Sequence, residues 1–147
     1  MEAMHVLVLH GPNLNLLGDR EPEIYGTQTL ADVNDLIATT AKDLGIEVRC
    51  EQLNGEGAII DALHAARTQY DAVVINPGAY AHYSYAIGDA VAAIGIPVVE
   101  VHLSNVTGRE SFRRTSVTAR AARGTIAGFG APGYALALRA LVEMVEK

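Results

Sequence analysis

The chain has 147 residues, half of them hydrophobic, and a formal net charge of −6 at pH 7. This length predicts a single domain over residues 1–147, and the acidic balance leaves no basic stripe for nucleic acid. No apolar run reaches the roughly 18 residues of a membrane span, and no signal peptide precedes the first apolar run. We therefore expect a cytoplasmic protein that binds neither nucleic acid nor membrane.

Short β-rich runs alternate with helical patterns along the chain. Strands are predicted at residues 5–10, 46–52, 72–76, 97–102 and 125–127. Apolar residues recur at helical spacing within residues 30–44, 59–66, 87–94 and 134–145, and Thr29 and Asp32 form a capping pattern before the first of these. The alternation predicts an α/β, flavodoxin-like three-layer fold. Its five-stranded parallel sheet has the order 2-1-3-4-5 and helices on both faces.

The segment from His10 to Gly26 is too long for an ordinary strand-to-helix connection of about 2–6 residues. Long loops at strand ends often carry lids and reacting groups. This loop contains Tyr25, and an arginine nearby would stabilise a tyrosinate by charge and hydrogen bonding. Arg20 and Arg109 are the candidate arginines, so the pattern predicts a phenol that acts as a base.

Polar residues follow four of the predicted strands, at the edge of the sheet where ligands bind in such folds. They are Asn13, Asn54, Glu56, Asn76, Glu100, His102, Ser104 and Asn105. His102 is a candidate general acid. Glu100 shares its strand face, and we expect it to orient His102 by a hydrogen bond rather than to share a metal ion with it.

His82 and Asp89 are seven residues apart, which is about two helical turns. Their plain interpretations are a helix cap and a solvated charge. The alternative is that they act in different pockets, one of them facing a neighbouring subunit. Five arginines gather near the end of the chain, either on a solvated surface helix or at an anion-binding site: Arg109, Arg113, Arg114, Arg120 and Arg123.

The composition argues against several chemistries. The five histidines form no metal-binding spacing and Cys50 is the only cysteine, so we expect no metal. Lys42 and Lys147 are the only lysines and neither is expected near the strand ends, which argues against a Schiff base. The GFGAPG motif matches a dinucleotide fingerprint, but too few residues follow it for the required acidic strand. We expect no cofactor.

Four motifs in order resemble type II 3-dehydroquinate dehydratase: GPNLNLLGDREPEIYG, QLNGEGAIID, INPGAYAHYSYAIGDA and EVHLSNVTGRESFR. The closing GTIAGFGAPGYALAL also fits, so the resemblance spans nearly the whole chain. It implies conversion of 3-dehydroquinate to 3-dehydroshikimate through an enolate, in the shikimate pathway or in quinate catabolism. It also implies a homododecamer built from trimers.

The resemblance assigns roles to individual residues. Tyr25 would take the C2 proton, Arg20 would activate it, and His102 would protonate the departing hydroxyl. Asn13 would hold the water that stabilises the enolate oxygen, and Glu100 would support this network. Residues implied to bind the ring hydroxyls are Asn76, His82, Asp89 and Arg113, and those implied to bind the carboxylate are Leu103 and Ser104.

The chain departs from the family pattern at Leu53, Ala81, Tyr83, Thr107–Gly108 and residues 115–120. None of these changes removes a proposed catalytic group. Two non-catalytic roles are the alternatives: a flavodoxin-like module that binds a small anion, and an assembly protein. Neither gives a reason for Tyr25, Arg20 and His102 to occur together.

Overall fold

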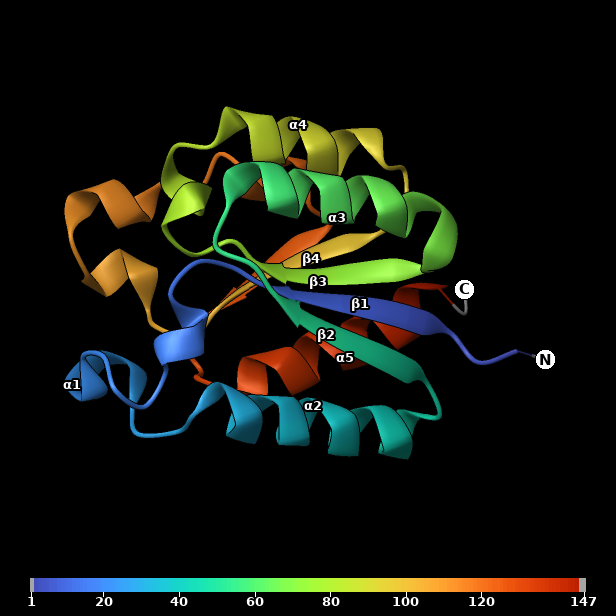
Figure 1. Cartoon of the computed structure of the whole chain (residues 1–147), viewed down its shortest axis with the longest axis horizontal. Helices are drawn as coiled ribbons and strands as arrows, with labels where there is room; N and C mark the ends of the chain where they lie inside the picture. The colour runs from blue at the N-terminus through green and yellow to red at the C-terminus, as the bar shows by residue number, and fades with distance from the viewer. Residues whose placement is uncertain (1, 146–147) are drawn as a thin grey trace.

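A five-stranded parallel sheet lies between two layers of helices in the computed structural model, which describes residues 2–145 (Figure 1). Its strands are β1 (His5–His10), β2 (Glu47–Gln52), β3 (Ala72–Asn76), β4 (Val98–His102) and β5 (Gly124–Ala127). The order is β2-β1-β3-β4-β5, and every neighbouring pair is parallel. The predicted fold class and strand order are therefore confirmed, with differences of one residue where β2, β4 and β5 begin.

Two helices cover each face of the sheet. Figure 1 shows α2 (Leu30–Leu44) and α5 (Pro132–Val145) below it, and α3 (Glu56–Gln69) and α4 (Tyr85–Ala93) above it. Alternate residues of β1 enter opposite cores, because successive side chains of a strand point to opposite faces. Val6 and Val8 pack with α2 and α5, whereas Leu7 and Leu9 pack with α3 and α4.

The start of α2 follows the predicted capping pattern. The Thr29 hydroxyl accepts a hydrogen bond from the Asp32 backbone N–H, and the Asp32 carboxylate accepts one from the Thr29 N–H. This reciprocal pair satisfies two of the backbone donors that a helix start leaves unpaired. It also fixes where the long loop after β1 rejoins the regular fold.

The first turn of α5 packs directly on the sheet. A Cβ atom at Gly133 would lie 3.4 Å from a Val101 methyl group and 3.5 Å from an Ile126 methyl group. Glycine therefore permits close packing of α5 on the sheet at this position, which is the packing role predicted for the glycines of GFGAPG.

The arginine-rich segment does not form the surface helix that was one prediction for it. It contains three short 3-10 turns, η3 (Val106–Gly108), η4 (Ser111–Arg114) and η5 (Ala119–Ala121). Tertiary hydrogen bonds replace helical ones between the last two turns, since the Val117 N–H donates to the Ala81 carbonyl and Ser116 and Thr118 donate to Glu100. The Ser116 hydroxyl also accepts from the Ala119 N–H, and such local side-chain contacts compete with a regular helix.

Candidate active site

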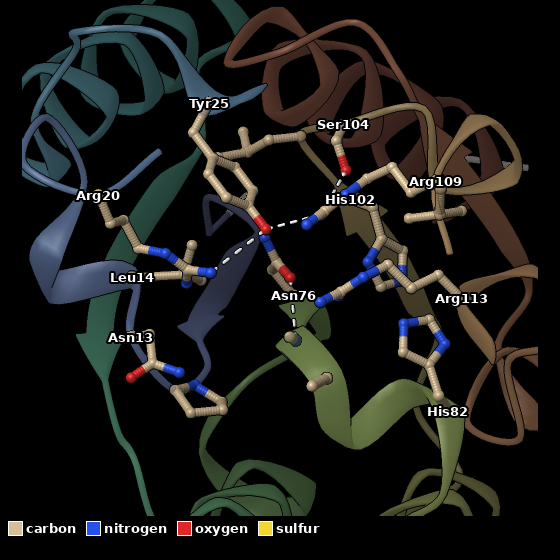
Figure 2. A pocket seen from close by; sticks show the side chains of 15 residues that line it. Asn13, Leu14, Arg20, Tyr25, Asn76, His82, His102, Ser104, Arg109 and Arg113 are labelled. Carbon is tan, nitrogen blue, oxygen red and sulfur yellow. Dashed lines mark hydrogen bonds between the residues drawn. The ribbon is translucent and has the colours of Figure 1, made fainter. Parts of the chain in front are cut away.

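A cleft of about 130 Å³ opens at the carboxyl ends of the central strands (Figure 2). Its walls come from the loop after β1, the four-residue helix α1 (Pro22–Tyr25), the end of β3, the turn η2 (Gly78–His82) and the segment after β4. It brings together ten of the twelve site residues predicted from the sequence, namely Asn13, Arg20, Tyr25, Asn76, His82, His102, Leu103, Ser104, Arg109 and Arg113.

The Tyr25 hydroxyl lies between two guanidinium groups. Its oxygen accepts a hydrogen bond of 2.7 Å from Arg109 Nη1 and a longer one of 3.4 Å from Arg20 Nη2. The guanidinium carbons of Arg20 and Arg109 also lie 4.6 and 5.1 Å from the centre of its ring. Two cations directed at one phenol oxygen stabilise the negative charge of a tyrosinate.

Arg109 is the more firmly enclosed of the two arginines. Its side chain is 11% exposed, against 28% for Arg20. Its Nη1 also donates to the Ser104 hydroxyl at 3.2 Å, while its buried Nε has no hydrogen-bond partner among the described residues. The nearest carboxylate oxygen, from Glu110, is 3.7 Å from Nε. A carboxylate oxygen of Glu21 also lies 3.9 Å from Nη2, so the charge of Arg109 acts on Tyr25 and on two acidic side chains.

Glu100 lies behind His102 rather than on the cleft wall, and only 1% of its surface is exposed. Because a carboxylate can only accept, His102 Nε2–H donates to Glu100 Oε2, at 2.9 Å. Nδ1 of His102 is then the ring nitrogen available to a ligand. The expected hydrogen bond between these two residues is present in the structure.

Two hydroxyl groups complete the surroundings of Glu100, and the sequence reasoning missed both. Ser116 Oγ donates to Oε2 at 2.7 Å, and Thr118 Oγ1 donates to Oε1. Burial by itself raises the pKa of Glu100, but hydrogen bonds from His102, Thr118 and Ser116 outweigh it and bring the pKa below its ordinary value. Glu100 is therefore ionised at neutral pH and keeps a negative charge next to His102.

His82 presents a neutral imidazole to the cleft. Burial, with the neighbouring charge of Arg113, holds the pKa of His82 below its ordinary value. Nδ1–H donates to the Thr115 carbonyl at 2.8 Å, which leaves Nε2 as an acceptor. Its ring stacks on His102 with 6.2 Å between centroids. His82 is not the cap of α4, since the Ser84 hydroxyl takes that position.

The loop after β1 is held against the end of β3. The Gly11 N–H donates to the Asn76 carbonyl at 2.7 Å, and a Cβ atom at Gly11 would lie 2.6 Å from that oxygen. Asn13 follows in the left-handed region, at φ 70°, which asparagine tolerates better than most residues. Its backbone N–H donates to the Asn54 side chain at 3.1 Å. These contacts place the Asn13 side chain at the cleft.

Similarity to known proteins settles which family has this site. A family model described as "Dehydroquinase class II" matches residues 4–142 of the chain.

The chain belongs to the class II dehydroquinase family.

Full-length relatives agree with this class II dehydroquinase assignment. The chain is 58% identical over 137 residues to a 3-dehydroquinate dehydratase of Pelotomaculum thermopropionicum, covering 93% of this chain and 95% of the relative. It is 56% identical to that of Desulforudis audaxviator, covering 98% and 96%. A crystal structure of the type II dehydroquinase from Butyrivibrio crossotus superposes with a TM-score of 0.93 at 49% identity, over 95% of this chain and 97% of that one.

Asp89 lies outside the cleft of this class II dehydroquinase. It is exposed on α4 and lines a separate hollow with Tyr85, Val117 and Arg120. The reason is local geometry. His82 ends η2 at the mouth of the cleft, whereas α4 carries Asp89 away along the outer surface. His82 and Asp89 of the same chain therefore lie at different hollows of the surface.

Metal chemistry in this class II dehydroquinase would need clustered metal ligands, and imine chemistry would need a lysine near the cleft. Among residues 2–145, no three His, Cys, Asp or Glu side chains come together in a way that could hold a metal ion. Lys42 is in the last turn of α2, at the opposite end of the sheet from the cleft, and Lys147 lies outside the described residues. Within the same range, no helix has the length and apolar character needed to cross a membrane.

Proposed function

We propose that the chain is a carbon–oxygen hydro-lyase that converts 3-dehydroquinate to 3-dehydroshikimate and water. The observation that supports this most directly is Tyr25, held by two guanidinium groups in the same cleft as the His102–Glu100 pair. The names of the full-length relatives support the same reaction. A non-catalytic anion-binding or assembly role is not favoured, because it leaves this arrangement without a use.

The first step is removal of a proton. Tyr25, as a tyrosinate, takes the proton from C2, beside the ketone of the substrate. The C–H electron pair moves into the ring and leaves an enolate. Arg20 and Arg109 stabilise the tyrosinate before transfer, and Asn13 holds a water molecule against the enolate oxygen. Such placed bases contribute about 10²–10⁴-fold to a rate.

The second step is loss of the hydroxyl group. The enolate re-forms the ketone, its electrons make the ring double bond, and the C–O bond breaks. His102 gives a proton to the departing oxygen so that water leaves. The ionised Glu100 stabilises the protonated imidazole before transfer. Return of the proton from Tyr25 to His102 through solvent resets the site.

Other cleft residues would bind the substrate. Asn76, His82 and Arg113 would hold its ring hydroxyls, with His82 accepting through Nε2. Leu103 and Ser104 would bind its carboxylate at the end of β4. The small cleft and its mixture of donors and acceptors suit a compact, polar ring.

Incubation of the purified protein with 3-dehydroquinate tests this function. The conjugated product absorbs ultraviolet light that the substrate does not, so absorbance should rise with time. The rate should survive a metal chelator, and it should survive borohydride in the presence of substrate. No rise at any protein concentration would exclude the proposed activity. Inactivation by borohydride with a covalent adduct would instead indicate an imine mechanism.

We also propose that the protein assembles as a homododecamer, a tetramer of trimers. Exposed aromatic side chains at the start of α4 support association, since Tyr83 and Tyr85 are 60% and 68% exposed, and Tyr85 lines the same hollow as Asp89. Large exposed apolar groups on one face are typical of interaction surfaces.

A cytoplasmic location stays a prediction, which fractionation of the source cells would check.

A further inference from the structure

A chain of hydrogen bonds runs from α2 along one face of the sheet, from β1 to β3, and ends at the cleft. His10 Nε2 lies 2.8 Å from Asn34 Oδ1, and His10 Nδ1 lies 3.0 Å from the Tyr134 hydroxyl. Asn76 Nδ2 lies 3.3 Å from the same hydroxyl. His10 and Tyr134 are each 1% exposed, and His10 is paired in register with Asn76 on the neighbouring strand. None of these contacts has a use in the proposed reaction steps.

The direction of each hydrogen bond follows from the donors and acceptors. Asn76 Oδ1 accepts from the Gly78 N–H at 3.1 Å, so Asn76 Nδ2 must donate to Tyr134. The Tyr134 O–H then donates a hydrogen bond to His10 Nδ1, and His10 Nε2–H donates one to Asn34 Oδ1. The reverse direction would leave the buried Tyr134 proton without an acceptor among its described partners, which is costly.

This arrangement requires a neutral His10. Burial lowers the pKa of His10 to about 4, although the hydrogen bond to Asn34 acts in the opposite direction. Burial also raises the pKa of Tyr134, which therefore keeps its proton. At neutral pH each partner thus has the protonation state that the chain of hydrogen bonds needs.

Asn76 is the end of this chain that reaches the cleft. Its amide is fixed at both ends, by Gly78 at the oxygen and by Tyr134 at the nitrogen. One N–H and one oxygen lone pair are left for a ligand. Loss of the Tyr134 contact would free the amide to turn and would reduce its preorganisation for a ring hydroxyl.

We propose that His10 and Tyr134 are positioning residues, which fix the Asn76 amide so that it presents a defined donor and acceptor to a hydroxyl of the substrate ring. This proposal rests on the proposed function. It assigns Tyr134 and His10 to substrate affinity rather than to proton transfer, because neither is within the cleft lining.

Tyr134→Phe tests the proposal, since it removes the hydroxyl and keeps the ring in the core. KM for 3-dehydroquinate should rise roughly fivefold, as expected for one lost hydrogen bond. kcat should stay within about twofold, because loss of binding energy that is equal in the ground state and the transition state raises KM alone. A purely structural role would lower the melting temperature and leave KM unchanged, and that result would overturn the proposal.

Two His10 variants give an independent test. In His10→Asn, the Oδ1 atom replaces Nδ1 as the acceptor for Tyr134, so KM should stay near the wild-type value. In His10→Phe the acceptor is lost and KM should rise as in Tyr134→Phe. Equal KM values in these two variants would overturn the proposal. A wild-type protein without activity would instead remove the proposed function, so the two failures are distinguishable.

Discussion

Tyr25 accepts hydrogen bonds from two arginines that are held to different degrees. Arg109 makes the shorter bond and is more buried than Arg20. Because charge acts more strongly where water is excluded, Arg109→Ala should reduce kcat more than Arg20→Ala does. We expect losses on the order of 10²–10³-fold for Arg109→Ala. Steady-state kinetics on both variants checks the order, and a larger loss in Arg20→Ala would contradict it.

Thr118 supports the proposed acid through Glu100. Thr118→Val has nearly the same shape and removes one of the hydrogen bonds that lower the pKa of Glu100. Hydrogen bonds to charged groups contribute about 1.5–3 kcal/mol, so the free energy of unfolding at pH 7 should fall by that order. kcat should also fall, since the carboxylate next to His102 is less well held.

Thr115→Val is the matched control for Thr118→Val. Thr115 is exposed, and its backbone carbonyl rather than its side chain binds His82. The control should therefore keep both the stability and kcat of the wild type. Equal behaviour of the two valine variants would remove the proposed role of Thr118.

At the scale of the elements, His10 connects β1 to α2 and α5 through Asn34 and Tyr134. Its folded pKa of about 4 lies below the ordinary 6.5. Below pH 6.5, His10 of the unfolded chain therefore binds a proton more readily than His10 of the folded chain does. Stability from neutral His10 is complete above that pH and is lost as the pH falls toward 4, by up to about 3 kcal/mol.

Urea unfolding at pH 7 and pH 4.5 measures this loss. His10→Asn does not titrate, so its two unfolding free energies should differ by clearly less than those of the wild type. The carboxylates of the chain are common to both proteins and cancel in the comparison. An identical pH dependence in the variant would show that His10 does not contribute to it.

The regular elements were predictable because their signals are local. The capping pattern at Thr29 and the alternation of Val6, Leu7, Val8 and Leu9 each involve a few neighbouring residues. The helix α1 was missed because four residues are too few to show a helical period. The arginine-rich segment was predicted wrongly in one of its two interpretations, because tertiary hydrogen bonds from Ser116 and Thr118 override its local preference.

The candidate site was predictable only in part, because some of its contacts join residues that are far apart in the sequence. The strand ends located Asn76 and His102, and the long loop located Tyr25. Arg109, however, is 84 positions from Tyr25, and Tyr134 is 124 positions from His10. No local pattern reports such a contact. Arg109 was named as one of two candidates, and the buried partners of Glu100 and His10 were not found.

At the scale of the whole molecule, Asp89 raises the question of shared active sites. It lies outside the cleft of its own subunit, on a face that also exposes Tyr85. If a trimer brings Asp89 to the cleft of a neighbour, Asp89→Ala and Tyr25→Phe will each be inactive alone. Mixing the two under conditions that exchange subunits should restore part of the activity, because some hybrid clefts contain both native residues.

Light scattering on the wild-type protein provides the control for subunit mixing. An active monomer at low concentration would contradict the shared site, and a stable trimer would contradict only the dodecamer. Mixtures that stay inactive although subunits exchange would contradict a role for Asp89 in the cleft of a neighbouring subunit.

The turnover number of Tyr25→Phe is the most direct measure of the central claim, that a phenol held by two arginines takes a proton from 3-dehydroquinate. The change removes one oxygen from a half-buried ring, so we expect the fold to stay intact. We expect kcat, followed by the ultraviolet absorbance of the product, to fall by about 10²–10⁴-fold, with an unchanged melting temperature. Turnover close to that of the wild type would contradict the account.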